Sequence, residues 1–341
     1  MAEKKAFKPL AWIGSLTAIF SVIGAVYGGW TFFSGQYEKR RAITALLAAE
    51  AVQISAQDYT SSWKTLEEAS AIDPGSEKVH EAQEDLAMQW LEHIHGTPDN
   101  TFTQISERLG PVLTRGANSA KSPQRQADLL AHLGFSYFLR RRESPSGPDP
   151  ESAYREAIQK DPSNPYAHAM WGHWIVWNHQ GLARGNQQFT AALASPRNLR
   201  PFVRSLQVSA ILNEHGSDYD LEAIRVANSI RKEQGDLDAH SRSSILFIYS
   251  VRMIPPDAST PAFLAAVPPA EHLATFDWIV REAGESGVLT RAYCRSRLLE
   301  AAGRDDEALA GYRELQKQSK SASYSIVNAT EQAIARMTGK R

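Results

Sequence analysis

Cysteine is almost absent from this sequence of 341 residues, which contains only Cys294. A single thiol cannot form a disulfide within the chain, and it cannot build a zinc site from cysteines alone. One thiol fits a reducing compartment and does not exclude an oxidising one. The sequence therefore predicts a fold held together by packing.

Neither sign of charge is in excess. The 37 lysines and arginines almost balance the 38 aspartates and glutamates, and the formal net charge is -1. No general positive field would attract a phosphate backbone, so we expect no nucleic-acid partner.

Sequence motifs of common catalytic sites are also missing. The chain has no G-x-S-x-G, no glycine-rich phosphate loop and no H-E-x-x-H. Carboxylates are plentiful, but no pair is singled out as an acid and a base. Cys294 would need exposure and a nearby base to act as a nucleophile, so we expect it in the core. We expect no catalytic residue, cofactor or metal, and a stand-alone enzyme is the weakest interpretation.

Residues 166–181 contain three histidines and three tryptophans, which raises the question of a metal or ligand site. Each helical residue advances by about 100°, which places His168 and His173 about 140° apart, and His173 and His179 about 120° apart. His168 and His179 share a face, but roughly 16 Å of rise separates them. No two of them can hold one metal ion from this helix, so the spacing favours a structural unit.

The sequence has one long hydrophobic run. Residues 10–33 contain no charged side chain, and at about 1.5 Å per helical residue they can cross a hydrocarbon core of about 30 Å. Trp12 and Trp30 lie near its ends, where amphipathic rings favour the membrane interface. The run exceeds the apolar core of a cleaved signal peptide. It predicts an uncleaved transmembrane helix after a short polar tail at residues 1–9, with a buried core helix as the alternative.

The basic residues around this run are evenly divided, three before it and three after it. The terminal amine tips the balance toward a cytoplasmic N-terminus, which would place the rest of the chain outside the cytoplasm. Gly24 and Gly28 form a G-x-x-x-G pair, a spacing that lets two helices approach closely. The pair is compatible with a homodimer, although small residues are common in membrane helices generally.

From about residue 36 the sequence has the pattern of successive short helices, and strand alternation is nearly absent. Breaks such as IDPGS, KDPSNP and EAAGRDD recur roughly every fifteen residues, which is typical of paired antiparallel helices. Two segments share a large residue, an alanine three positions later and a proline five positions after that: Leu66, Ala69 and Pro74, and Tyr154, Ala157 and Pro162. Gly134 and Gly172 on the preceding and following helices would allow close helix packing.

This pattern resembles the tetratricopeptide repeat, a helix pair with a glycine on its first helix and small, aromatic and small residues on its second. The resemblance is clearest at residues 43–75, 127–162, 165–195 and 289–317. Residues 76–120 and 199–283 match only in helix length and turn spacing, so their register stays open. The resemblance implies an all-α fold in which residues 34–341 form a right-handed solenoid of seven or eight helix pairs, capped by a helix over residues 321–337.

The resemblance also implies a concave groove lined by the first helix of each pair. Equivalent places around Gly134 and Gly172 are held by six candidate partner-binding residues: Asp128, Phe135, Leu139, Tyr166, His173 and Trp177. Such a groove would suit a peptide or helix that inserts apolar anchors. The alternative is that the aromatic residues bury against neighbouring repeats. Trp171 takes the place of the repeat's buried leucine and is expected in the core.

The expected function is that of a non-catalytic, membrane-anchored scaffold that recruits a protein or peptide partner. Two alternatives remain open, an accessory subunit of a separately encoded enzyme and a factor in cell-envelope assembly.

Overall fold

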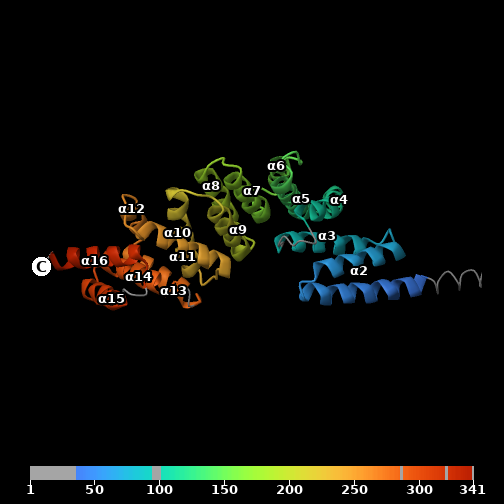
Figure 1. Ribbon diagram of the computed structural model, residues 1–341. Helices are drawn as coiled ribbons and strands as arrows, with labels where there is room; N and C mark the ends of the chain where they lie inside the picture. The colour runs from blue at the N-terminus through green and yellow to red at the C-terminus, as the bar shows by residue number, and fades with distance from the viewer. Residues whose placement is uncertain (1–35, 94–100, 285–286, 319–321, 340–341) are drawn as a thin grey trace, which may run out of the picture. The chain divides into compact units, whose positions relative to one another are not determined.

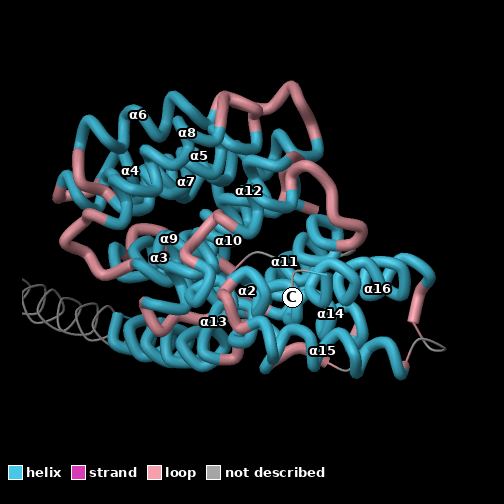
Figure 2. Tube along the Cα trace, turned by 90° about the vertical axis from the view of Figure 1, so that its left-hand side faces the viewer, coloured by secondary structure: helices cyan, strands magenta, loops and turns pink. Residues whose placement is uncertain are grey.

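The computed structural model describes residues 36–93, 101–284, 287–318 and 322–339. Within these ranges every regular element is a helix, and turns or short loops join the helices (Figure 2). The all-α prediction is therefore confirmed for the part of the chain that the structure describes.

The predicted N-terminal tail and transmembrane helix at residues 1–9 and 10–33, with Gly24 and Gly28, lie outside the described residues. None of the helices in the described part of the chain combines the length and the apolar composition that a membrane crossing requires.

The chain groups into two compact units. The first combines the described residues before His95 with Pro111–Gly116, and the second combines Gly96–Gly110 with the chain from Ala117 onward. Helix α4 (Phe102–Ser119) contributes to both. That residues 34–341 form a single domain stays a prediction.

The first unit contains a helix over residues 36–55, α2 (Tyr59–Ile72) and α3 (Glu77–Glu92). The Asp58 carboxylate accepts a hydrogen bond from the Ser61 amide and caps the start of α2. Leu66 and Ala69, the repeat residues of this segment, are fully buried. The predicted helix pair over residues 43–75 corresponds to the helix over residues 36–55 and α2.

The second unit is a succession of helices in chain order (Figure 1). After α4 these are α5 (Pro123–Glu143), α6 (Pro150–Lys160), α7 (Pro165–Trp177), α8 (Leu182–Leu193), α9 (Arg200–Leu212), α10 (Ser217–Lys232), α11 (Ala239–Met253), α12 (Thr260–Leu264), α13 (Pro269–Arg281), α14 (Val288–Ala301), α15 (Asp305–Lys317) and α16 (Tyr324–Gly339). The predicted pairs over residues 127–162, 165–195 and 289–317 correspond to α5 with α6, α7 with α8, and α14 with α15.

Contacts between helices show how the pairs stack. Each helix packs on its partner, and the first helix of one pair also packs on the first helix of the next. In this way α5 contacts α7, α7 contacts α9, α9 contacts α11, and α11 contacts α14. In the weakly matching segment, α13 takes the place of the second helix, because it packs on α10 and α14 while the short α12 lies before it. The described helices therefore repeat as stacked pairs.

Glycines set the separation of the paired helices, as the sequence predicts. A Cβ on Gly134 would lie 2.7 Å from Cε1 of Tyr154, whose ring is fully buried in the α5–α6 pair. A Cβ on Gly172 would lie 3.1 Å from the Gly185 carbonyl oxygen and 3.2 Å from Cζ of Phe189. At Gly134 only glycine leaves room for the Tyr154 ring, and at Gly172 a side chain would require its neighbours to shift by a few tenths of an ångström.

The predicted capping helix over residues 321–337 is α16. It packs on α14 and α15 and buries Ile326, Ala329 and Ala333. The Arg336 guanidinium donates hydrogen bonds to both carboxylate oxygens of Glu300 on α14, at 3.0 and 2.8 Å. A bidentate pair of this kind fixes the orientation of the last helix.

Candidate partner-binding surface

The row of first helices in the second unit carries the six predicted groove residues. Three of them are buried, with Phe135 exposed by 6%, Leu139 by 2% and His173 by 4%. Tyr166 and Trp177 are half-buried, and so is Asp128. A partner reaching this face would therefore meet the last three, while the first three lie beneath them. Binding itself is untested, and the groove stays a prediction.

Phe135 and His173 belong to an aromatic cluster between α5 and α7. The His173 ring lies edge-on to Phe138 with a centroid distance of 5.0 Å, and Trp177 lies edge-on to Phe138 at 5.3 Å. Trp177 also stacks on Trp174 at 5.5 Å. Edge-on and stacked rings add to the free energy of burial, so this cluster joins the two pairs. Sequence reasoning missed Phe138 and Trp174, although both are large aromatic residues on the predicted helices.

The expectation that Trp171 lies in the core is only partly met. Its side chain is half-buried, and the Arg155 guanidinium lies 5.5 Å from the centroid of its ring. The neighbouring Trp174 is the fully buried tryptophan of α7.

Two of the three arginines at the end of α5 cover the aromatic cluster. The Arg141 guanidinium lies 5.8 Å from the Trp174 ring, and that of Arg142 lies 6.0 Å from the Phe138 ring and 5.1 Å from the Phe102 ring. Arg140 pairs with Glu107 at 3.4 Å. These cations also face the negative end of the helix. The surface beside Trp177 is thus aromatic with a positive edge.

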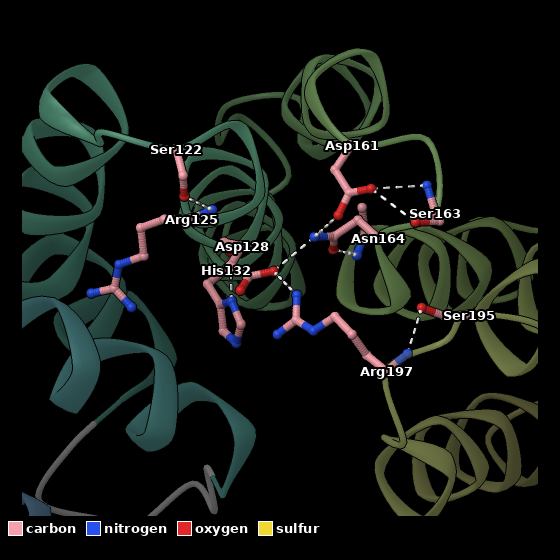
Figure 3. Close-up of polar contacts among 10 residues, drawn as sticks. Ser122, Arg125, Asp128, His132, Asp161, Ser163, Asn164, Ser195 and Arg197 are labelled. Atoms are coloured by element: carbon pink, nitrogen blue, oxygen red, sulfur yellow. Dashed lines mark hydrogen bonds and ion pairs between the residues drawn. The ribbon is translucent and has the colours of Figure 1, made fainter.

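Asp128 holds two pairs together. Its Oδ1 accepts a hydrogen bond from Nδ2 of Asn164 at 2.7 Å and from Arg197 at 2.6 Å (Figure 3). The Asn164 side-chain oxygen in turn accepts from the Ala167 amide and caps the start of α7. Since Asp128 is on α5 and Arg197 follows α8, the predicted groove residue is a clamp between successive repeats.

Tyr166 lies above this clamp. The Arg197 guanidinium lies 5.3 Å from the centroid of its ring, Phe202 of α9 meets it edge-on at 5.1 Å, and His132 of α5 packs on it at 4.7 Å. Its ring is thus held in place by residues of α5, of α9 and of the turn that precedes α9. Such a ring is preorganised for a contact, because little rotamer freedom is left to lose.

A second exposed apolar area lies on α11 and was absent from the sequence-based prediction. Phe247 is 69% exposed and Val251 is 49% exposed, one helical turn apart. Their spacing was visible in the sequence, but the register of residues 199–283 was open, so nothing distinguished them from core residues.

Comparisons with known proteins find similarity among solved structures. No protein-family model matches the chain, and no curated protein sequence matches it. A crystal structure of a tetratricopeptide repeat protein from Parabacteroides merdae is similar, with a TM-score of 0.41 and 11% sequence identity, over 86% of this chain and 99% of that one. The repeat assignment of this chain rests on its own glycine, aromatic and proline positions and on the helix pairs described above.

Among the described residues, no group of three or more histidine, cysteine, aspartate or glutamate side chains is arranged to hold a metal ion. Cys294 is 1% exposed, as the sequence predicts, and burial raises the pKa of its thiol to about 12. The reactive thiolate is therefore scarce at neutral pH.

This environment predicts that Cys294 resists alkylation in the folded chain. Because the thiol is buried and protonated, an excess of iodoacetamide at pH 8 should label it only in denaturant. Mass spectrometry of the intact chain gives the measurement. Rapid labelling without denaturant would show that the α11–α14 core opens readily.

Proposed function

We propose that this chain is a non-catalytic scaffold of the tetratricopeptide type, which binds a protein partner on the face formed by its first helices. The observation that carries the proposal is the preorganised surface at Tyr166 and Trp177. Tyr166 is held by Phe202 of α9 and Trp177 by Phe138 of α5, yet both rings are partly open to solvent. Partly exposed, rigid aromatic side chains are typical anchors of protein interfaces.

Residues 10–33 would anchor this scaffold in a membrane, with the repeats outside the cytoplasm. The apolar run and its flanking tryptophans support the anchor, and the terminal amine supports the orientation. Anchoring would raise the local concentration of a captured partner near the bilayer. Reporters fused after Arg341, one active only in the cytoplasm and one only outside it, test the orientation. Activity of the cytoplasmic reporter alone would contradict it.

A photo-crosslinking amino acid at position 177 tests the partner surface. We expect the full-length chain in its native cells to form a defined crosslink from this position, because the Trp177 ring lies at the rim of the aromatic cluster. The matched control is Glu156, an exposed residue on α6, a second helix. The crosslinked species are measured by gel shift and mass spectrometry.

The crosslink should also depend on Tyr166. Tyr166→Ala removes the other partly exposed aromatic anchor. It should reduce the yield of the crosslink at position 177 by about tenfold, as expected for a hot-spot residue. An undiminished crosslink in this variant, or an equal crosslink at position 156, would exclude the first-helix face as the binding surface.

A further inference from the structure

The exposed apolar residues of α11 line a groove. This hollow of about 590 Å³ runs along α11 and is bounded by the end of α9 and the turn before α10. Its lining includes Leu212, Glu214, Asp220, Phe247, Ile248 and Val251. A volume of this size is within the range of ligand-binding clefts.

Phe247 and Val251, which line the groove, are not part of the protein's hydrophobic core. Helix α11 buries Ile245, Tyr249 and Met253, each 0% exposed, on the side that faces the main core. Phe247 and Val251 lie on the other side and remain open to solvent. Adjacent large apolar residues on a folded surface are costly to hydrate, which marks an interaction site.

One end of the groove is acidic. Glu214 lies at the turn after α9, and Asp218 and Asp220 lie in the first turn of α10. Arg252 pairs with Asp220 at 2.6 Å and balances one of these three charges. Three imidazoles are also nearby: His215 and His240 line the groove, and Nδ1 of His179 lies 3.1 Å from Glu214. Each is charged only when protonated.

The neighbouring Tyr219 reports the sign of the local field. Burial raises the pKa of its hydroxyl, and the charges of Glu214 and Asp218 raise it further. The carboxylates of Glu214 and Asp218 therefore lie close enough to give this end of the groove negative charge. An apolar floor with a negative end complements an apolar segment with a positive end.

We propose that this groove binds a peptide segment of a partner protein in which aliphatic or aromatic side chains precede arginine or lysine. The apolar side chains would pack on Phe247, Ile248 and Val251, and the cation would meet Asp218 and Glu214. This inference rests on the proposed scaffold function and adds the chemistry of a bound segment. The acidic end disfavours anionic phosphate groups of lipids and nucleic acids.

Two synthetic peptides test the proposal against the full-length chain. The first is a fluorescein-labelled helical peptide with two leucines one turn apart followed by two arginines, and the second replaces the arginines with glutamates. Fluorescence anisotropy should show binding of the basic peptide and binding at least about tenfold weaker for the acidic one. Raising the salt concentration should narrow this difference, because the charged groups are partly exposed.

Variants locate the site. Phe247→Ala should weaken binding of the basic peptide by about tenfold or more, as expected for a central anchor. Asp218→Lys should weaken binding of the basic peptide and strengthen binding of the acidic peptide. Tyr324→Ala is the matched control, because Tyr324 is 85% exposed on α16, away from the groove. Circular dichroism verifies that each variant keeps its helical content.

The outcomes separate this proposal from the proposed function. Absence of binding by either peptide, equal binding of both, or binding unaffected by Phe247→Ala would each overturn the groove proposal. Binding to anionic phosphatidylglycerol vesicles that Phe247→Ala abolishes would overturn it in favour of a membrane contact. If neither peptide binds while the crosslink at position 177 still forms, the groove proposal falls and the scaffold function stands.

Discussion

Lowering the pH from 7 to 5 should destabilise the folded chain by about 4 kcal/mol through His173 and His272. Both imidazoles are held in apolar surroundings. Burial lowers the pKa of His173 to about 4, and the nearby Arg142 guanidinium lowers it in the same direction. Burial likewise lowers the pKa of His272 to about 4, against a small opposing effect of the Leu264 carbonyl.

The direction of the effect follows from where each state binds protons. In the unfolded chain both histidines bind protons below their ordinary pKa of 6.5. In the folded chain they bind protons only near pH 4 and below. The contribution of these two histidines to the free energy of unfolding is therefore fully present above pH 6.5 and is lost as the pH falls from 6.5 toward 4. At about 1.4 kcal/mol per pH unit, each histidine costs roughly 2 kcal/mol by pH 5. We choose pH 5 because most carboxylates are still ionised there.

Urea unfolding at fixed pH values, followed by tryptophan fluorescence, measures this dependence. His173→Phe and His272→Phe should each remove about half of the slope between pH 7 and 5, because phenylalanine binds no proton. The exposed His215 is the matched control, and its replacement with phenylalanine should leave the slope as in the parent chain. A parent chain with equal stability at both pH values would contradict the burial of these imidazoles.

The helix pairs were predictable because their signals are local. Helices α2 and α6 both end two residues before a proline, at Ile72 before Pro74 and at Lys160 before Pro162. Gly134 marked the position where the two helices of a pair approach most closely. The space left by its missing side chain is filled by a large side chain of the partner helix. Local breaks and small residues of this kind need no knowledge of distant contacts.

The roles of individual groove residues were not predictable in the same way. Asp128 meets Arg197, which lies 69 positions along the chain, so no local pattern could assign it to a clamp. Helix α7 contains almost no polar residue to mark its exposed side. Its periodicity could therefore not decide whether Trp171 or Trp174 enters the core.

The α11 groove was missed for a related reason. A stretch such as ILFIY contains apolar residues on both sides of a helix, and the sequence does not tell which side the next pair covers. The structure decides it, because α9 leaves part of α11 uncovered and Phe247 remains exposed.

Packing at Gly134 gives the second large effect. The new methyl group of Gly134→Ala overlaps the buried ring of Tyr154, and this strain should cost about 1 to 3 kcal/mol. Alanine gains roughly 1 kcal/mol over glycine in helix propensity, so the variant should destabilise the second unit by up to about 2 kcal/mol. Tyr154→Ala should cost about 3 to 5 kcal/mol through the cavity that it leaves in the α5–α6 pair.

Combining the two changes tests the contact directly. The double variant should lose less stability than the sum of the single variants, by about 0.5 to 3 kcal/mol, because the cavity accommodates the added methyl group. Gly110→Ala on α4 is the matched control, since a Cβ there meets nothing within 4 Å, and it should stabilise the chain slightly. If the losses of unfolding free energy measured in urea were strictly additive, Gly134 and Tyr154 would not set the spacing of the α5–α6 pair. Other contacts would then have to determine how closely these two helices pack.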